Sequence, residues 1–158
     1  MQIEVFILVD RIRSLSIEDG LVQCDSAVPV DSSIYLGHFP GHPILPGVLL
    51  IESMAQTAGW LILAHTKFER FPFLSIVNEA KLRDFVTPGM QLLLEARLLH
   101  EGSGFFKTSN RVLVDGKVKC EAETTFRVMP FPSPVFRENV IAQARRVGFP
   151  AELVPNAG

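Results

Sequence analysis

The stretch GHFPGHPILPGVLLIESMAQ, residues 37–56, decides the fold because it leads from a turn-rich loop into a long apolar helix. The loop contains His38, and the helix is predicted to begin at Gly47. Between residues 32 and 66 the single formal charge is that of Glu52. Because a carboxylate is rarely buried without a partner, we expect Glu52 to have a chemical function.

The composition is that of one globular domain. The chain has 158 residues, 47% of them hydrophobic, which is enough for a sizeable core. Its formal net charge is −2 and it contains no basic run, which argues against a nucleic-acid partner. Cys24 and Cys120 lie far apart without metal-ligand spacing, which favours free thiols in the reducing cytoplasm. Polar residues interrupt the apolar run 47–64, which favours a buried helix over a membrane span.

Alternating apolar and polar residues predict about six antiparallel strands around this helix. Segments 4–13 and 21–30 flank Asp19-Gly20, a dipeptide suited to a hairpin turn. Further strands are predicted at 73–86, 91–100, 105–114 and 118–128. The predicted class is α+β, with the helix inserted after the second strand. Because one sheet covers only part of a helix that is apolar all round, we expect at least a dimer.

The last 29 residues, 130–158, are predicted to form a separate element. Three prolines between residues 130 and 134 end the sheet. Ser133 and Pro134 are suited to the N-cap and first position of a helix, and apolar residues recur at helical spacing from Phe136 to Val147. We therefore divide the chain into a domain, 1–129, and a C-terminal helical extension, 130–158. This helix either covers a sheet edge or the dimer surface, or it contributes to a site.

His38, Gly47 and Glu52 together have the chemistry of an acid-base site. Prolines and glycines hold His38 on a stiff loop next to the helix start. The unpaired N–H groups of a helix N-terminus stabilise an oxygen that gains negative charge, and glycine leaves room for it. A histidine suits the role of base, and a carboxyl group in apolar surroundings suits that of acid. A base, an oxyanion donor and an acid are what elimination of water from a 3-hydroxyacyl thioester requires.

The motifs HFPG, P-x-x-PGVL and E-x-MAQ within residues 38–56 resemble the active-site signature of the FabZ-type (3R)-hydroxyacyl-[acyl-carrier-protein] dehydratases. The resemblance covers residues 6–128 and includes the LVDRI and VDGKV segments. It implies a hot-dog fold, in which a sheet wraps around one central helix. It also implies the formation of trans-2-enoyl thioesters in fatty acid biosynthesis, with no redox or metal cofactor, since the phosphopantetheine of acyl carrier protein carries the substrate.

The resemblance also implies roles for individual residues. His38 and Glu52 correspond to the catalytic pair, and the family builds its site across a homodimer, so His38 of one chain would face Glu52 of the other. The expected assembly is this dimer or a trimer of such dimers. Gly47 would polarise the thioester carbonyl, and Gln56 would support Glu52. The candidate substrate-binding residues are Gly47, Phe39, Val48, Gln56, Phe71 and Phe73.

Acyl carrier protein is acidic, so basic residues are candidates for its binding. Lys81 and Arg83 lie on the polar face of segment 73–86, whose alternation predicts a strand with its other face buried. Lys67 and Arg70 in the preceding loop are further candidates. A strand face that is simply exposed to solvent explains the positions of Lys81 and Arg83 equally well.

Some features differ from the family pattern. The extension is longer than that of a typical member and is similar to specialised members that serve very-long-chain lipid A biosynthesis, so we expect it to cap or extend the acyl tunnel.

One alternative function is that of a dehydratase that also isomerises the double bond, but such a dehydratase carries aspartate in place of Glu52. A non-catalytic module for acyl binding or scaffolding would be expected to lack His38 or Glu52. His42 follows His38 in a loop broken by prolines, which argues against a metal site.

Overall fold

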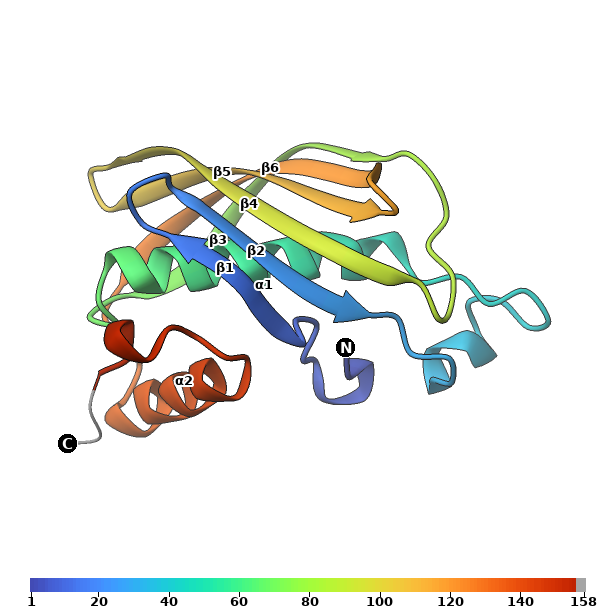
Figure 1. The fold of residues 1–158 in the computed structure, drawn as a ribbon, viewed down its shortest axis with the longest axis horizontal. Coiled ribbons are helices and arrows are strands. Elements are labelled where there is room, and N and C mark those ends of the chain that lie inside the picture. Colours follow the sequence, from blue (N-terminus) through green and yellow to red (C-terminus); the bar gives the residue numbers. More distant parts are fainter. Residues whose placement is uncertain (156–158) are drawn as a thin grey trace.

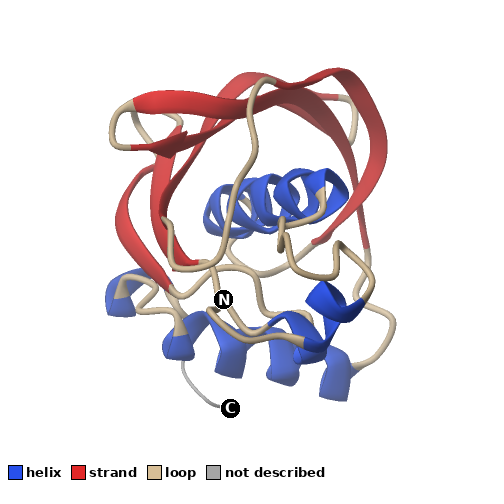
Figure 2. Cartoon of the chain, turned by 90° about the vertical axis from the view of Figure 1, so that its right-hand side faces the viewer, coloured by secondary structure: helices blue, strands red, loops and turns tan. Residues whose placement is uncertain are grey.

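The computed structural model describes residues 1–155 and confirms the predicted α+β class: a six-stranded antiparallel sheet wraps around one long helix (Figures 1 and 2). The strand order is β1-β2-β4-β5-β6-β3, so β1 and β3 form the two edges. The strands are β1 (Arg11–Ser16), β2 (Leu21–Ala27), β3 (Phe71–Leu82), β4 (Gln91–Gly102), β5 (Phe105–Val114) and β6 (Lys117–Met129). The helices are α1 (Gly47–His65) and α2 (Pro134–Arg146), with 3₁₀ turns at Ile3–Val5, Ser33–Leu36 and Ala151–Leu153.

Helix α1 forms the centre of the core. It begins at Gly47 as predicted, and 12 of its 19 residues are buried. Its hydroxyl groups bond to the preceding turn: Ser53 donates to the Leu50 carbonyl at 2.8 Å, and Thr57 donates to the Ser53 carbonyl at 2.8 Å. By length and composition α1 is apolar enough to cross a membrane, but 72% of its apolar window is buried inside the fold. It is therefore a core helix, as the sequence predicted.

The first strand begins later than the sequence pattern predicts. Segment 4–13 was expected to be a strand, but β1 starts at Arg11 and the preceding residues fold back on themselves. The Met1 amino group lies 2.6 Å from Asp10 Oδ2 and donates to the Ala27 carbonyl at 2.7 Å. Leu8 and Val9 are both buried, although neighbouring residues in a strand would face opposite sides. The apolar start of the chain thus lines the core as an irregular segment.

Strand β3 differs more strongly from the prediction that one of its faces is buried. Every residue from Ser75 to Leu82 is exposed. The strand lies at the sheet edge, and its pairing with β6 shifts register twice, between Leu74 and Ile76 and between Asn78 and Lys81. Each shift changes which side chains share a face, so the alternation in the sequence does not map onto one buried side. A single chain consequently has an edge strand with exposed apolar side chains.

Helix α2 follows its predicted signals. The Ser133 hydroxyl accepts a hydrogen bond from the Phe136 amide at 3.1 Å, and Pro134 occupies the first turn. The Val147 carbonyl then accepts from the Ile12 amide at 2.7 Å, which ties the end of the helix to β1. Figure 2 shows the sheet arched over one side of α1 and α2 lying on the other. Of the expected extension 130–158, residues 156–158 lie outside the described residues.

Candidate active site

His38 lies in the loop before α1, with its backbone held on both sides. Its amide donates to the Ile34 carbonyl at 3.0 Å, and its carbonyl accepts from the Ile44 amide at 3.0 Å. His38 Nδ1 lies 2.9 Å from the Ile44 carbonyl oxygen. Because a carbonyl oxygen only accepts hydrogen bonds, Nδ1 carries the hydrogen and Nε2 of the neutral ring keeps its lone pair. This tautomer is the one that a general base requires.

The half-buried His38 lines a cavity of about 330 Å³ together with the first residue of α1, Gly47. The amide groups of a first helical turn have no partner within the helix and carry its positive end. A Cβ atom added to Gly47 would overlap Leu82 Cδ1 and lie 3.0 Å from Leu82 Cδ2, so a larger residue at this point requires the exposed side chain of Leu82 to move. The cavity therefore combines a free ring nitrogen with a helix N-terminus that admits a small polar group.

Glu52 lies in a different cavity, of about 440 Å³. Gln56, one turn further along α1, donates from Nε2 to Glu52 Oε1 at 3.1 Å and to the Phe6 carbonyl at 3.0 Å. Gln56 Oε1 accepts from the Leu8 amide at 3.0 Å. Three hydrogen bonds thus fix both ends of the Gln56 amide, and one of them orients the carboxyl group of Glu52.

Within one chain, His38 and Glu52 face different spaces. Among residues 1–155, none lines both cavities. The reason lies in helix geometry: each residue turns an α-helix by about 100°, so Glu52 points about 140° away from Gly47. The cavity of His38 and the helix N-terminus therefore lies on one side of α1, and the carboxyl group of Glu52 points to the other.

Of the expected substrate-binding residues, Gly47 lines the cavity of His38, three line the cavity of Glu52, and Phe39 and Val48 line neither. Phe39 stacks on His38 with ring centroids 4.2 Å apart, and Val48 beside Gly47 is 69% exposed. Phe71 and Phe73 instead line the cavity of Glu52. Phe71 also contacts Phe131 and, edge to face at 5.1 Å, Phe136. These contacts are made with the segment that begins the C-terminal extension.

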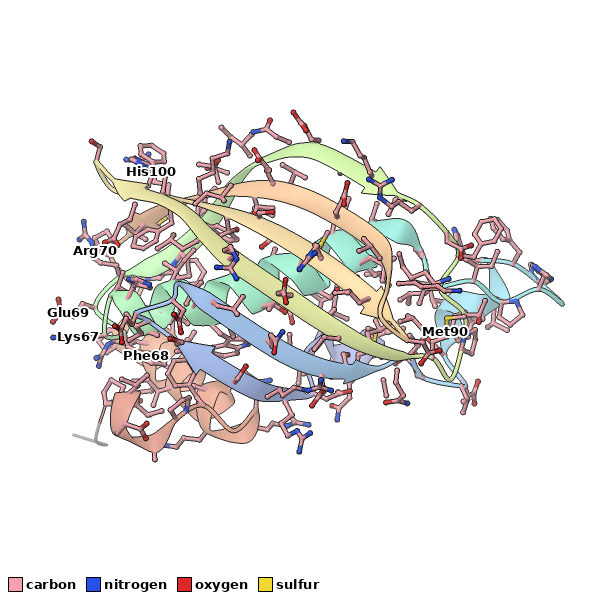
Figure 3. The ribbon with its side chains drawn as sticks, turned by 45° about the horizontal axis from the view of Figure 1, so that its top comes forward. Lys67, Phe68, Glu69, Arg70, Met90 and His100 are labelled. Carbon is pink, nitrogen blue, oxygen red and sulfur yellow. The ribbon has the colours of Figure 1, made fainter. Side chains whose placement is uncertain are left out.

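The structure separates the basic residues considered for acyl carrier protein. Arg83 lines the cavity of His38 but forms an ion pair with Glu121, and this hydrogen bond holds the pKa of the Glu121 carboxyl below its ordinary value. Lys81 lies in a separate depression among acidic residues of β3 and β6. Lys67 and Arg70 follow the far end of α1, about 28 Å from its start for 19 residues. Figure 3 shows them at the opposite end of the molecule from Met90.

Several residues that line the cavity of Glu52 were not predicted from the sequence. Trp60 comes from α1 and Phe126 from β6, α2 contributes Val140 and Gln143, and Val147 follows directly after α2. Trp60 lies eight residues beyond Glu52, on the same side of the helix, and this spacing could have identified it. The helical spacing in the extension indicated a packing face but not which surface that face meets.

The comparisons with known proteins agree with the fold. The chain matches the FabA-like domain over residues 2–123. It resembles the dehydratase heterocomplex ApeI:P from Xenorhabdus doucetiae in fold, with a TM-score of 0.63 at 22% identity over 86% of this chain and 90% of that one. The architecture and the helix with its paired cavities thus define a hot-dog protein of the FabA-like class.

Curated relatives narrow the assignment. The chain is 41% identical over 120 residues to the 3-hydroxyacyl-[acyl-carrier-protein] dehydratase FabZ of Syntrophotalea carbinolica, covering 75% of this chain and 81% of that protein. It is 37% identical over 121 residues to FabZ of Protochlamydia amoebophila, covering 77% and 79%. The chain belongs to the FabZ family of 3-hydroxyacyl-[acyl-carrier-protein] dehydratases, which are hydro-lyases of fatty acid biosynthesis.

Proposed function

We propose that this protein converts (3R)-3-hydroxyacyl-[acyl-carrier-protein] into the trans-2-enoyl form by acid-base catalysis. The observation that carries the proposal is that His38, whose Nδ1 is bonded to the Ile44 carbonyl, lines the same cavity as Gly47 at the helix N-terminus. The two curated relatives are named as dehydratases of this substrate. Residues 1–129 form the catalytic domain in this account.

The complete site requires two chains, because Glu52 points away from the cavity of His38 in its own chain. The exposed edge strand β3 supplies a surface for a second copy, since an unpaired strand edge readily pairs with another chain. Its exposed apolar side chains are Phe73, Ile76, Val77 and Leu82. In a dimer with two-fold symmetry, each surface patch serves both copies, so the protein would have two equivalent sites. Each site combines His38 and Gly47 of one chain with Glu52 of its partner.

The reaction begins when His38 Nε2 takes a proton from C2 of the substrate. The electron pair moves into a C2–C3 double bond, with transient negative charge on the thioester oxygen, and the Gly47 amide stabilises this charge. Glu52, in its neutral form, gives its proton to the C3 hydroxyl group, which leaves as water. Afterwards His38 carries a proton and Glu52 has lost one, and transfer of that proton from His38 to Glu52 restores the enzyme.

The carrier protein is the proposed partner, and the opening near His38 is the place where its phosphopantetheine would enter. Arg83 lines that cavity and is a proposed contact for an acidic surface, and Lys81, which lies in a separate depression, is a proposed contact outside the cavity. We place the protein in the cytoplasm. Cys24 and Cys120 are free and buried, and burial raises the pKa of the Cys24 thiol to about 12, which keeps it protonated at neutral pH.

Formation of the enoyl thioester, followed by its absorbance, tests the proposal. The wild type should dehydrate 3-hydroxybutyryl-[acyl-carrier-protein], whereas His38→Ala and Glu52→Gln should each lower kcat by about a hundredfold or more. His42→Ala is the matched control, because this exposed histidine lies in the same loop and lines neither cavity. A wild-type protein without turnover contradicts the proposed reaction. Mutants as active as the His42 control contradict the residue assignment.

A further inference from the structure

One wall of the Glu52 cavity comes from α2, which lies beyond the residues matched by the family model. Val140, Gln143 and Val147 line the cavity from positions i, i+3 and i+7, so they share one face of the helix. Val147 is almost fully buried, whereas Val140 is partly buried against the core. The family match ends at residue 123, so this wall is a feature of the extension.

The cavity has the shape and the lining of a site for an aliphatic chain. On α1 its lining runs from Glu52 through Gly59 to Leu63, which lies eleven positions further on, or about 16 Å along the helix axis. Besides Glu52, Gln56, Gln143 and the indole nitrogen of Trp60, which has no hydrogen-bond partner within the described part of the chain, the side chains that line it are apolar. Its volume of about 440 Å³ is within the range of small-molecule sites. A chain attached to a group that reacts beside Glu52 would extend along this wall.

Helix α2 is fixed in place. Arg137 Nε donates to the Phe68 carbonyl at 2.7 Å, and Arg146 donates to the side chain of Gln2 at 3.0 Å. After the helix, Phe149 packs edge to face on Phe68 at 5.2 Å and on Trp60 at 6.1 Å. These contacts hold α2 against the rest of the fold, with Val140 and Gln143 lining the cavity.

We propose that α2 is a specificity element of the dehydratase, in which Val140 sets the length of acyl chain that fits beyond Glu52. The inference rests on the proposed function, since it assigns the cavity to the acyl part of the same substrate. Side chains of α2 then shield the distal methylene groups of the acyl chain from water. Each methylene group that fits strengthens binding by about fourfold.

Two substitutions at Val140 test this proposal, because they should shift the chain-length preference in opposite directions. Val140→Phe narrows the cavity and Val140→Ala widens it. The measured quantity is the ratio of kcat/KM for 3-hydroxydecanoyl to that for 3-hydroxybutyryl substrates on acyl carrier protein. If Phe excludes two methylene groups, the ratio falls about fifteenfold, and Ala shifts the preference towards still longer chains. Val135→Phe is the matched control, since Val135 lies on the same helix, is 64% exposed and does not line the cavity.

The outcomes separate this inference from the proposed function. A wild type that dehydrates neither substrate contradicts the proposed function, and with it the assignment of the cavity. Normal dehydration by the wild type, with an unchanged chain-length ratio in both Val140 variants, overturns the role of α2 alone. An equal loss for both substrates in Val140→Phe, without any loss in Val135→Phe, also overturns it, because that result indicates a general structural effect.

Discussion

Replacing Gln56 by leucine should lower both stability and activity, because this amide joins the N-terminal segment to the carboxyl group of Glu52, the proposed acid. Leucine has a similar size but provides neither a donor nor an acceptor. The substitution removes the hydrogen bonds to Glu52 Oε1, to the Phe6 carbonyl and from the Leu8 amide. Leu8 is fully buried, so its amide would then have no partner in that position.

The size of the effect follows from these three bonds. Each hydrogen bond contributes about 1 kcal/mol net, so their loss costs about 3 kcal/mol of unfolding free energy. For a chain of this length, 1 kcal/mol corresponds to about 2–4 °C in Tm, and the expected decrease is therefore about 6–12 °C. Glu52 also loses the contact that orients it, and kcat should fall about tenfold.

Thermal unfolding followed by circular dichroism measures the change, with wild type and variant at equal protomer concentration because dimerisation raises Tm. Gln56→Glu is the matched control. It keeps an acceptor for the Leu8 amide but loses both donated bonds and places a second carboxyl group beside Glu52. A Tm for Gln56→Leu within about 1 °C of the wild type would refute the reasoning, since that corresponds to less than one hydrogen bond.

Two further predictions concern stability. Gly47→Ala should cost about 1 kcal/mol through overlap with Leu82, and adding Leu82→Ala should recover most of it; additive effects in a double-mutant cycle would argue against the overlap. Burial alone would raise the pKa of Glu95. Hydrogen bonds from Arg111 and Gln23 outweigh the effect of burial, so the pKa of this carboxyl group lies below its ordinary value of 4.5. Its contribution to stability is thus present above about pH 4.5 and lost as pH falls further, so Glu95→Gln should show a shallower acid loss in denaturant titrations. Parallel pH profiles of the two proteins would contradict this.

The sequence predicts most of the fold because its signals are local. Periodicity and caps located α1, α2 and six strands, and Ser133 caps α2 as expected. Two interpretations failed for reasons that depend on distant residues. The N-terminal segment is held by Asp10 and Gln56 rather than by strand pairing. Strand β3 carries two register shifts that no local pattern reveals.

The site was partly predictable because several of its candidate residues lie close together in the sequence. His38, Gly47, Glu52 and Gln56 lie within twenty residues and carry a recognisable motif. The cavity of Glu52 brings together residues nearly ninety positions apart, such as Glu52 and Val140. This arrangement depends on how the extension folds back over α1. Long-range packing of this kind is set by the complete core and is not readable from spacing along the chain.

The central claim is that each active site combines His38 of one chain with Glu52 of the other. Dimers with one His38→Ala chain and one Glu52→Gln chain, purified through two different affinity tags, test it most directly. One of their two sites would then be intact, so activity should reach about half that of the wild-type dimer, although each homodimeric variant is inactive. A mixed dimer as inactive as its two parents would contradict the account, since it would mean that both residues act within one chain.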